Sequence, residues 1–187
     1  MWGRAARAGA ADPAPVGHPP TAKLWLRRCA ASRAAPDDPA TLLVTDFSRE
    51  RAWTVVEERS VDEALREMEC AGVGALLVMR SEIVTGLVTC FDLQGRRPLD
   101  SLRPSAPASR AEIQVAHVMT PWDRVTVLDW RSISTSRVRH VEAWARNTRV
   151  THALLVEQLN DAAYVRGLLS RAHVERSLGW SLQGIHP

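Results

Sequence analysis

Hydrophobic and polar positions repeat in the same order in two parts of the chain. The run Ala-Leu-Leu-Val occurs at residues 75–78 and again at residues 153–156. A similar phrase follows each copy, Gly-Leu-Val-Thr at residues 86–89 and Gly-Leu-Leu-Ser at residues 167–170. A short continuous apolar run is typical of a strand that is buried on both faces. The pattern therefore predicts a buried strand and a returning strand in each half.

A helix is predicted before the buried strand of each half. In the first half, Ser60 followed by Glu63 is the pattern of a capping box, and apolar residues follow it at helical spacing up to Gly72. Gly72 suits the left-handed position that ends a helix. In the second half, residues 137–147 carry apolar side chains on one helical face.

The remaining elements complete the same order twice. Short β-branched segments at residues 54–56 and 126–128 predict a first strand in each half. Residues 91–95 predict a helix or turn after the first returning strand, and residues 171–179 predict a last helix. Each half therefore has the order β-α-β-β-α, with a longer hairpin turn, residues 158–163, in the second.

This order favours an α/β (α+β) fold made of two repeats. One unit would leave a face of its sheet uncovered, whereas two copies can cover each other. We expect the repeats to pack sheet to sheet as one pseudo-twofold module. Repeat 1 is assigned to residues 41–98, a linker to 99–112, repeat 2 to 113–180 and a tail to 181–187. Residues 1–40, rich in Ala, Pro and Arg, are expected to be a disordered or poorly ordered extension.

Composition narrows the class of protein. The chain of 187 residues is 45% hydrophobic and 24% charged, as in soluble globular proteins, and no run approaches the ~18 apolar residues of a membrane span. The net charge of +3 resides in the first 40 residues, so the neutral body is not expected to attract nucleic acid. The scattered cysteines Cys29, Cys70 and Cys90 indicate a reducing, cytoplasmic location without disulfides.

Three phrases resemble a known family. Residues 115–121, VAHVMTP, resemble the opening of many CBS domains, the repeats named after cystathionine β-synthase. Residues 61–68, VDEALREM, and 86–93, GLVTCFDL, are similar to the helix and the strand-to-helix corner of that family. The resemblance covers about residues 41–180 and implies a stand-alone tandem CBS pair. It also implies a homodimer that binds AMP, ADP, ATP or S-adenosylmethionine between the repeats and regulates a partner protein, which is unknown.

The first strand-to-helix corner carries chemistry suited to a nucleotide. A strand end before a helix start exposes unpaired backbone N–H groups, which favour an anion. The Thr89 hydroxyl can donate to a phosphate oxygen, and the Asp92 carboxylate can accept hydrogen bonds from ribose hydroxyls. By resemblance, Thr89 is the phosphate contact and Asp92 the ribose contact. The residues alone also allow Thr89 to be a strand residue and Asp92 a helix N-cap.

The second corner departs from the family pattern. Ser170 supplies the hydroxyl, and Arg171 is either a phosphate contact or a solvated charge. His173 stands where the carboxylate is expected. A neutral imidazole has one acceptor nitrogen, so it cannot easily hold both ribose hydroxyls. We therefore expect the second site to be weaker, altered in ligand, or empty.

An adenine ring would need an apolar slot. By resemblance, the slot lies near the first strand and before the buried strand of each half. The corresponding residues are Val55 or Val56, Gly74, Ala75, Val127, His152 and Ala153. Small residues leave room for a flat ring, although they equally suit close helix–sheet packing.

Motifs of catalysis and metal binding are absent from the sequence. It contains no GxxxxGK[ST], GxGxxG, GxSxG or HExxH, and its six histidines lack ligand spacing. Because Asp92 is assigned to the sugar, no general base remains near Thr89 or Ser170, so we predict neither an enzyme, a metal site nor a catalytic cofactor. The alternative function is a structural dimerisation adaptor with vestigial clefts. Trp144 is expected in the core, and Trp122 and Trp130 on a dimer surface.

Overall fold

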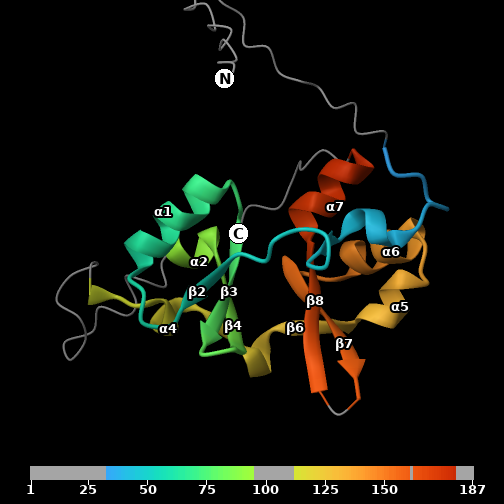
Figure 1. The fold of residues 1–187 in the computed structure, drawn as a ribbon. Helices are drawn as coiled ribbons and strands as arrows, with labels where there is room; N and C mark the ends of the chain where they lie inside the picture. The colour runs from blue at the N-terminus through green and yellow to red at the C-terminus, as the bar shows by residue number, and fades with distance from the viewer. Residues whose placement is uncertain (1–32, 95–111, 161, 180–187) are drawn as a thin grey trace, which may run out of the picture. The chain divides into compact units, whose positions relative to one another are not determined.

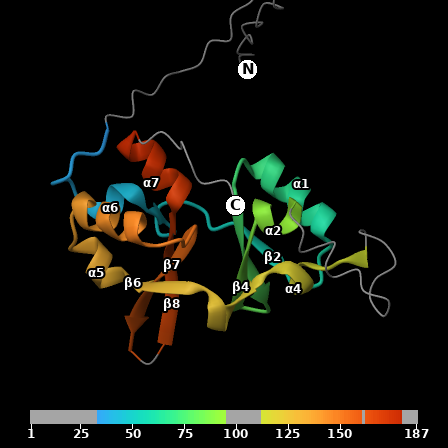
Figure 2. The ribbon, with the colours of Figure 1, turned by 180° about the vertical axis from the view of Figure 1, so that it is seen from behind.

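Two four-stranded sheets form the framework of the protein (Figures 1 and 2). The structure is a computed structural model that describes residues 33–94, 112–160 and 162–179. Sheet 1 has the strand order β2-β3-β4-β5, and sheet 2 has the order β1-β8-β7-β6. The helices within residues 61–94 and 115–118 lie beside sheet 1, and the helices within residues 130–178 lie beside sheet 2 (Figures 1 and 2).

The predicted order β-α-β-β-α is confirmed in both halves. The strands are β1 (Thr45–Asp46), β2 (Thr54–Val56), β3 (Ala75–Arg80), β4 (Ile83–Thr89), β5 (Thr120–Pro121), β6 (Thr126–Asp129), β7 (His152–Leu159) and β8 (Ala162–Ser170). The helices are α1 (Val61–Ala71), α2 (Cys90–Gln94), α4 (Val115–Val118), α5 (Trp130–Ser134), α6 (Val138–Asn147) and α7 (Arg171–Leu178). Short 3-10 turns are η1 (Ala40–Leu43) and η3 (Trp122–Arg124). Helix α5 is an addition that the pattern did not predict, and β7 and β8 extend into the predicted turn.

The capping box predicted for α1 is present. The Glu63 N–H donates to Ser60 Oγ at 3.3 Å, and the Ser60 N–H donates to Glu63 Oε2 at 3.4 Å. At the other end, Gly72 adopts a left-handed conformation with φ of 66°. The helix therefore begins and ends where its sequence predicts.

The central strands are buried on both faces, as predicted. In β3, Leu76 and Val78 pack in the cluster beneath the helices of the first half. Leu77, between them, faces the opposite way and joins Leu87 and Leu154 in a separate cluster that connects the two sheets. Burying one leucine side chain stabilises a fold by about 1.5–3 kcal/mol. The predicted packing of sheet against sheet is therefore confirmed.

Each sheet contains one short strand from the other half of the chain. Strand β1 lies near the start of the first half but pairs antiparallel with β8, and β5 lies near the start of the second half but pairs with β4. Neither two-residue strand was predicted from the sequence. This exchange connects the halves by backbone hydrogen bonds as well as by apolar packing.

The glycines of the two repeated phrases make the exchange possible. A Cβ atom built at Gly86 would lie 2.6 Å from the Thr120 carbonyl oxygen, and one built at Gly167 would lie 2.7 Å from the Thr45 carbonyl oxygen. Real Cβ atoms do not approach backbone so closely. Glycine recurs at this place because the exchanged strand runs directly against it.

The N-terminal boundary of the fold lies earlier than the sequence indicated. Residues 33–40 were assigned to the extension, yet Ala40 is fully buried in the core of the second half. The Ala40 N–H donates to the Ser136 carbonyl oxygen at 3.1 Å. Residues 1–32, nearly all of the predicted linker and the C-terminal tail lie outside the described residues.

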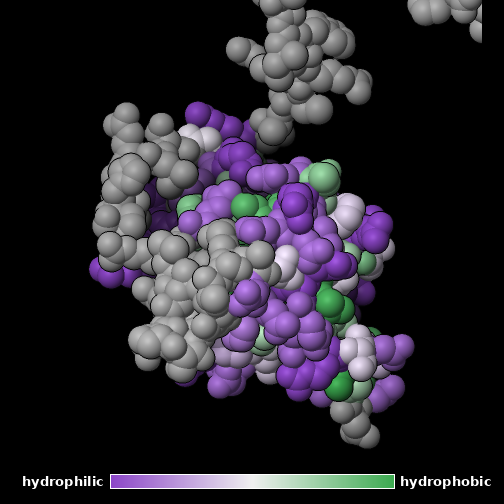
Figure 3. Space-filling view, turned by 90° about the vertical axis from the view of Figure 1, so that its left-hand side faces the viewer, coloured by the Kyte–Doolittle hydropathy of each residue, from purple (hydrophilic) through white to green (hydrophobic). Residues whose placement is uncertain are grey.

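The tryptophans differ in their surroundings. Trp144 packs against the core of the second half, as expected, and so does Trp130, over whose ring the Arg166 guanidinium lies at 5.0 Å. Contacts within the chain therefore account for Trp130, which we had expected on a dimer surface. Trp122 is exposed. The face shown in Figure 3 is mostly hydrophilic, with scattered hydrophobic residues, and the homodimer stays a prediction.

Replacing Gly86 by alanine tests the exchange of strands. We expect Gly86→Ala to lower the free energy of unfolding by about 1–3 kcal/mol, because the added methyl group collides with the backbone of β5. Chemical denaturation measures this change. Gly74→Ala is the matched control, since its Cβ would meet nothing within 4 Å. Equal effects of the two substitutions would contradict the proposed contact.

Candidate functional site

Two clefts lie where the two halves of the chain meet. The first cleft has a volume of about 320 Å³ and the second about 210 Å³. The first cleft is lined by Leu87, Thr89, Phe91, Asp92, Thr120, Arg124, Val125, Thr126, Arg149, Val150, Thr151 and His152. The second cleft is lined by Thr45, Phe47, Arg51, Trp53, Gly72, Val73, Gly74, Ala75, Leu77, Leu87, His152, Leu168, Ser170, His173 and Arg176.

The corner of each half faces the opposite half. Thr89 and Asp92 of the first corner line the first cleft together with residues 149–152, which lead into β7. Ser170 and His173 of the second corner line the second cleft together with residues 72–75, which lead into β3. Each cleft is therefore built from both repeats and depends on their packing.

The first corner is held by a reciprocal capping interaction at the start of α2. The Thr89 hydroxyl donates to Asp92 Oδ2 at 2.7 Å, and the Thr89 N–H donates to the same oxygen at 3.0 Å. In return, the Asp92 N–H donates to Thr89 Oγ1 at 3.3 Å. The Cys90 N–H donates to the Gly74 carbonyl oxygen at 3.0 Å.

These bonds change the expected chemistry of the first corner. The N–H groups of Thr89, Cys90 and Asp92 are already paired within the chain, which contradicts the expectation that they are exposed to an anion. The residue types alone had also allowed Thr89 to be a strand residue and Asp92 the helix N-cap. Thr89 does end β4, but it is Thr89 that precedes α2, and Asp92 lies within the helix. An anion in the first cleft would therefore have to be held mainly by side chains. The ligand roles of Thr89 and Asp92 stay predictions.

The second corner lacks the capping interaction of the first. Ser170 precedes α7 but makes no side-chain hydrogen bond to the helix. His173 Nε2 lies 3.4 Å from the Leu42 carbonyl oxygen and does not bond back to Ser170. The imidazole at this position thus changes the local hydrogen bonding as well as the charge.

Arg171 forms hydrogen bonds within its own half. Its Nε donates to Glu175 Oε1 at 2.9 Å, and a terminal nitrogen donates to the Thr148 carbonyl oxygen at 2.8 Å. Arg171 is not among the residues that line either cleft. Its charge is accounted for by these contacts, so the structure offers no contact of Arg171 with a cleft.

The residues proposed for an adenine slot divide into two groups. Gly74, Ala75 and His152 line a cleft. Val55 and Ala153 are buried in the helix-side cores, while Val56 and Val127 are 48% and 42% exposed. None of these four lines either cleft, because their side chains point into a core or to solvent.

Sequence reasoning missed the cations of both clefts. Arg124 and Arg149 line the first cleft, and Arg51 and Arg176 line the second. All four are exposed, and isolated arginines in a sequence cannot be told from ordinary solvated charges. Only the packing of the repeats brings them to the corners.

His152 belongs to both clefts. Burial lowers the pKa of the His152 imidazole, and the nearby Asp92 carboxylate acts in the opposite direction. The neutral imidazole is therefore favoured in the folded protein. The folded protein therefore has its full stability, as far as His152 is concerned, above the ordinary pKa of 6.5. Part of that stability is lost as the pH falls below 6.5 toward the lowered pKa of the folded state, because the unfolded chain then binds the proton more readily.

Other site classes find no support among the described residues. Within the described ranges, no group of three or more His, Cys, Asp or Glu side chains could hold a metal ion. No helix among those residues is both long and apolar enough to cross a bilayer. Cys70 and Cys90 are free thiols, and Cys29 lies outside the described residues.

Comparison with known proteins identifies the architecture. No protein-family model and no curated protein matches the sequence. Solved structures do match. The CBS domain structure NE2398 is 24% identical and has a TM-score of 0.51, and the match covers 70% of this chain and 91% of that one. The chain has the fold of a tandem CBS-domain pair.

Two further solved structures are similar to the chain in fold. A CBS-domain protein from Burkholderia ambifaria, provisionally named for signal transduction, is 22% identical with a TM-score of 0.54, covering 79% of this chain and 96% of that one. An uncharacterized conserved protein from Pyrococcus horikoshii is 20% identical with a TM-score of 0.54, covering 81% and 99%. At these identities the likeness establishes the fold of the CBS pair.

Removing the Asp92 charge tests the electrostatics of the first cleft. In Asp92→Asn we expect the pKa of His152 to fall below its value in the parent protein, because the carboxylate opposes the effect of burial. An NMR titration of the His152 ring measures the shift. Glu82→Gln, which alters an exposed hairpin residue, is the control and should leave it unchanged. An unchanged or higher pKa in Asp92→Asn would contradict the predicted contact.

Proposed function

We propose that this CBS pair is a non-catalytic regulatory module that binds an adenosine-containing ligand of the AMP, ADP or ATP class in the first cleft. The observation that carries the proposal is the lining of that cleft. It combines one carboxylate, Asp92, with two guanidinium groups, Arg124 and Arg149. A sugar and a phosphate require these two kinds of group.

The charges in the first cleft suit a sugar phosphate. Asp92 accepts two hydrogen bonds from Thr89. A carboxylate has about four acceptor sites, so it can also accept hydrogen bonds from ribose hydroxyls. Arg124 and Arg149 would hold the phosphate. A charge-assisted hydrogen bond contributes about 1.5–3 kcal/mol. Both arginines are exposed, so solvent weakens their bonds to phosphate and each bond should contribute an energy near the lower end of this range.

The first cleft also offers apolar surface for a base. Phe91 lines it with a side chain that is 72% exposed, and Val125 and Val150 are partly buried in its wall. Stacking of a base on an aromatic ring contributes about 1–3 kcal/mol. A purine beside Phe91 would cover an apolar side chain that otherwise faces water.

Binding without turnover follows from the roles assigned to these residues. Asp92 is the one carboxylate that lines either cleft in the described part of the chain. It bonds to Thr89 at the start of α2 and is assigned to the sugar, so no other carboxylate of the lining can act as a general base, and we assign no proton transfer to His152.

A ligand in the first cleft would act as a link between the repeats. It would contact the first corner and residues 149–152 of the second half at once, so it would stabilise one relative position of the two sheets. Such a change is suited to signal to a partner protein or across a homodimer. The competing function is a structural adaptor with vestigial clefts.

Calorimetric titration with AMP, ADP, ATP and S-adenosylmethionine tests the proposal. We expect at least one of them to bind, and Asp92→Asn to weaken that binding by roughly tenfold through loss of the ribose contact. A 2′-deoxy analogue should bind weakly to the parent protein and lose little further affinity in Asp92→Asn.

Glu63→Gln is the matched control for this experiment. It alters the corresponding residue of another capping box, at α1, which lines neither cleft. Glu63→Gln should therefore leave the affinity unchanged. Equal losses in the two variants would contradict a ribose contact by Asp92, and no binding of any ligand to folded protein would favour the adaptor.

A further inference from the structure

The second cleft differs from the first in its charge. Two arginines and two histidines line it, Arg51, Arg176, His152 and His173, and its described lining contains no aspartate or glutamate. The first cleft has Asp92 at its corner, whereas His173 takes the equivalent place here. The two clefts of the same fold therefore present different chemistry to a ligand.

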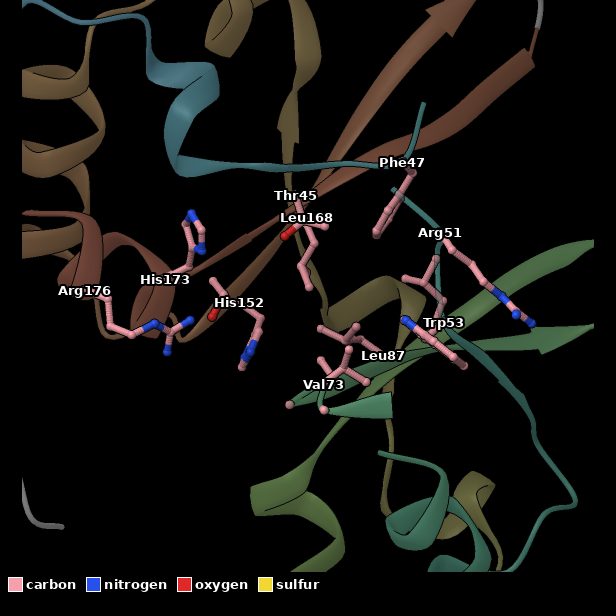
Figure 4. A pocket seen from close by; sticks show the side chains of 15 residues that line it. Thr45, Phe47, Arg51, Trp53, Val73, Leu87, His152, Leu168, His173 and Arg176 are labelled. Atoms are coloured by element: carbon pink, nitrogen blue, oxygen red, sulfur yellow. The ribbon is translucent and has the colours of Figure 1, made fainter. Parts of the chain in front are cut away.

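Three of these four side chains gather at one side of the second cleft. His173 and Arg176 are three residues apart on α7, so they lie on the same helical face. His152 comes from the start of β7. Figure 4 shows these three side chains together on one side of the cleft, with Phe47 and Trp53 on the other.

The opposite side of the second cleft is aromatic and belongs to the first half. Phe47, Arg51 and Trp53 lie on the segment that connects β1 to β2. The Arg51 guanidinium lies over the Trp53 ring at 4.6 Å from its centre. This side adds a second arginine and an apolar wall, and it faces the side of α7 that carries His173 and Arg176, because β1 pairs with β8.

We propose that the second cleft binds the phosphate groups of an oligophosphate ligand through Arg176, His173 and His152, without reading ribose hydroxyls. Guanidinium groups and imidazole N–H groups donate to phosphate oxygens. A carboxylate can accept from both hydroxyls of a ribose diol, and the described lining of this cleft contains no carboxylate. The inference rests on the proposed function only in taking the clefts between the repeats as ligand sites.

Trimetaphosphate is a suitable probe, because it has no nucleoside and its charge does not change near neutral pH. Calorimetry would use the full chain carrying Arg149→Gln, a substitution that weakens phosphate binding in the first cleft. In this background we expect Arg176→Gln and His173→Gln each to weaken binding by roughly tenfold. Arg66→Gln, an equal loss of charge on the exposed face of α1, should have little effect.

One further variant separates binding from folding. His173→Asp restores the residue type of the first corner and can form the same capping interaction. It should therefore fold at least as stably as the parent protein while weakening trimetaphosphate binding more than His173→Gln does.

The outcomes distinguish this inference from the proposed function. The inference would be overturned if trimetaphosphate did not bind, or if its binding did not change in Arg176→Gln and His173→Gln. The proposed function would still stand in that case, provided that a nucleotide binds and that its binding depends on Asp92. Trimetaphosphate binding that depends on Arg176 and His173, without nucleotide binding in the first cleft, would support the inference alone. An equal effect of Arg66→Gln would also overturn it.

Discussion

The close approach of two short strands to two glycines determines how the halves of this protein are assembled. Strand β5 runs against Gly86 of the first half, and β1 runs against Gly167 of the second. Between them, Leu77 and Leu154 belong to the cluster that holds the sheets face to face. Both clefts lie along this junction and take residues from both halves. The chemistry of the clefts therefore exists only while the halves are packed.

Much of the fold could be predicted because its signals are local. The two apolar runs, the box at Ser60 and Glu63, and the terminal Gly72 act through neighbouring residues, and their elements formed where the sequence indicated. The exchanged strands could not be predicted, since two residues carry no periodicity and their partners are distant in sequence. The packing of Ala40 into the second core was missed for a similar reason.

The candidate site was predictable only in part. Strand-end hydroxyls and the residues three positions later identified both corners, and the structure places them in clefts. The side chains that face each corner come from the opposite half, so Arg149 and Arg176 carried no signal in the sequence. Arg171 shows the reverse case, because it is adjacent to a corner but pairs with Glu175 on its own helix.

The two halves combine a common backbone with different polar groups. The first corner has a carboxylate and the second an imidazole. We propose on this basis that one cleft binds a sugar phosphate and the other phosphate alone. A crystal structure grown with an adenine nucleotide tests this account most directly. It predicts the ribose beside Asp92 in the first cleft, with the phosphates toward Arg149. A nucleotide bound away from both clefts, or with Asp92 far from the sugar, would contradict it.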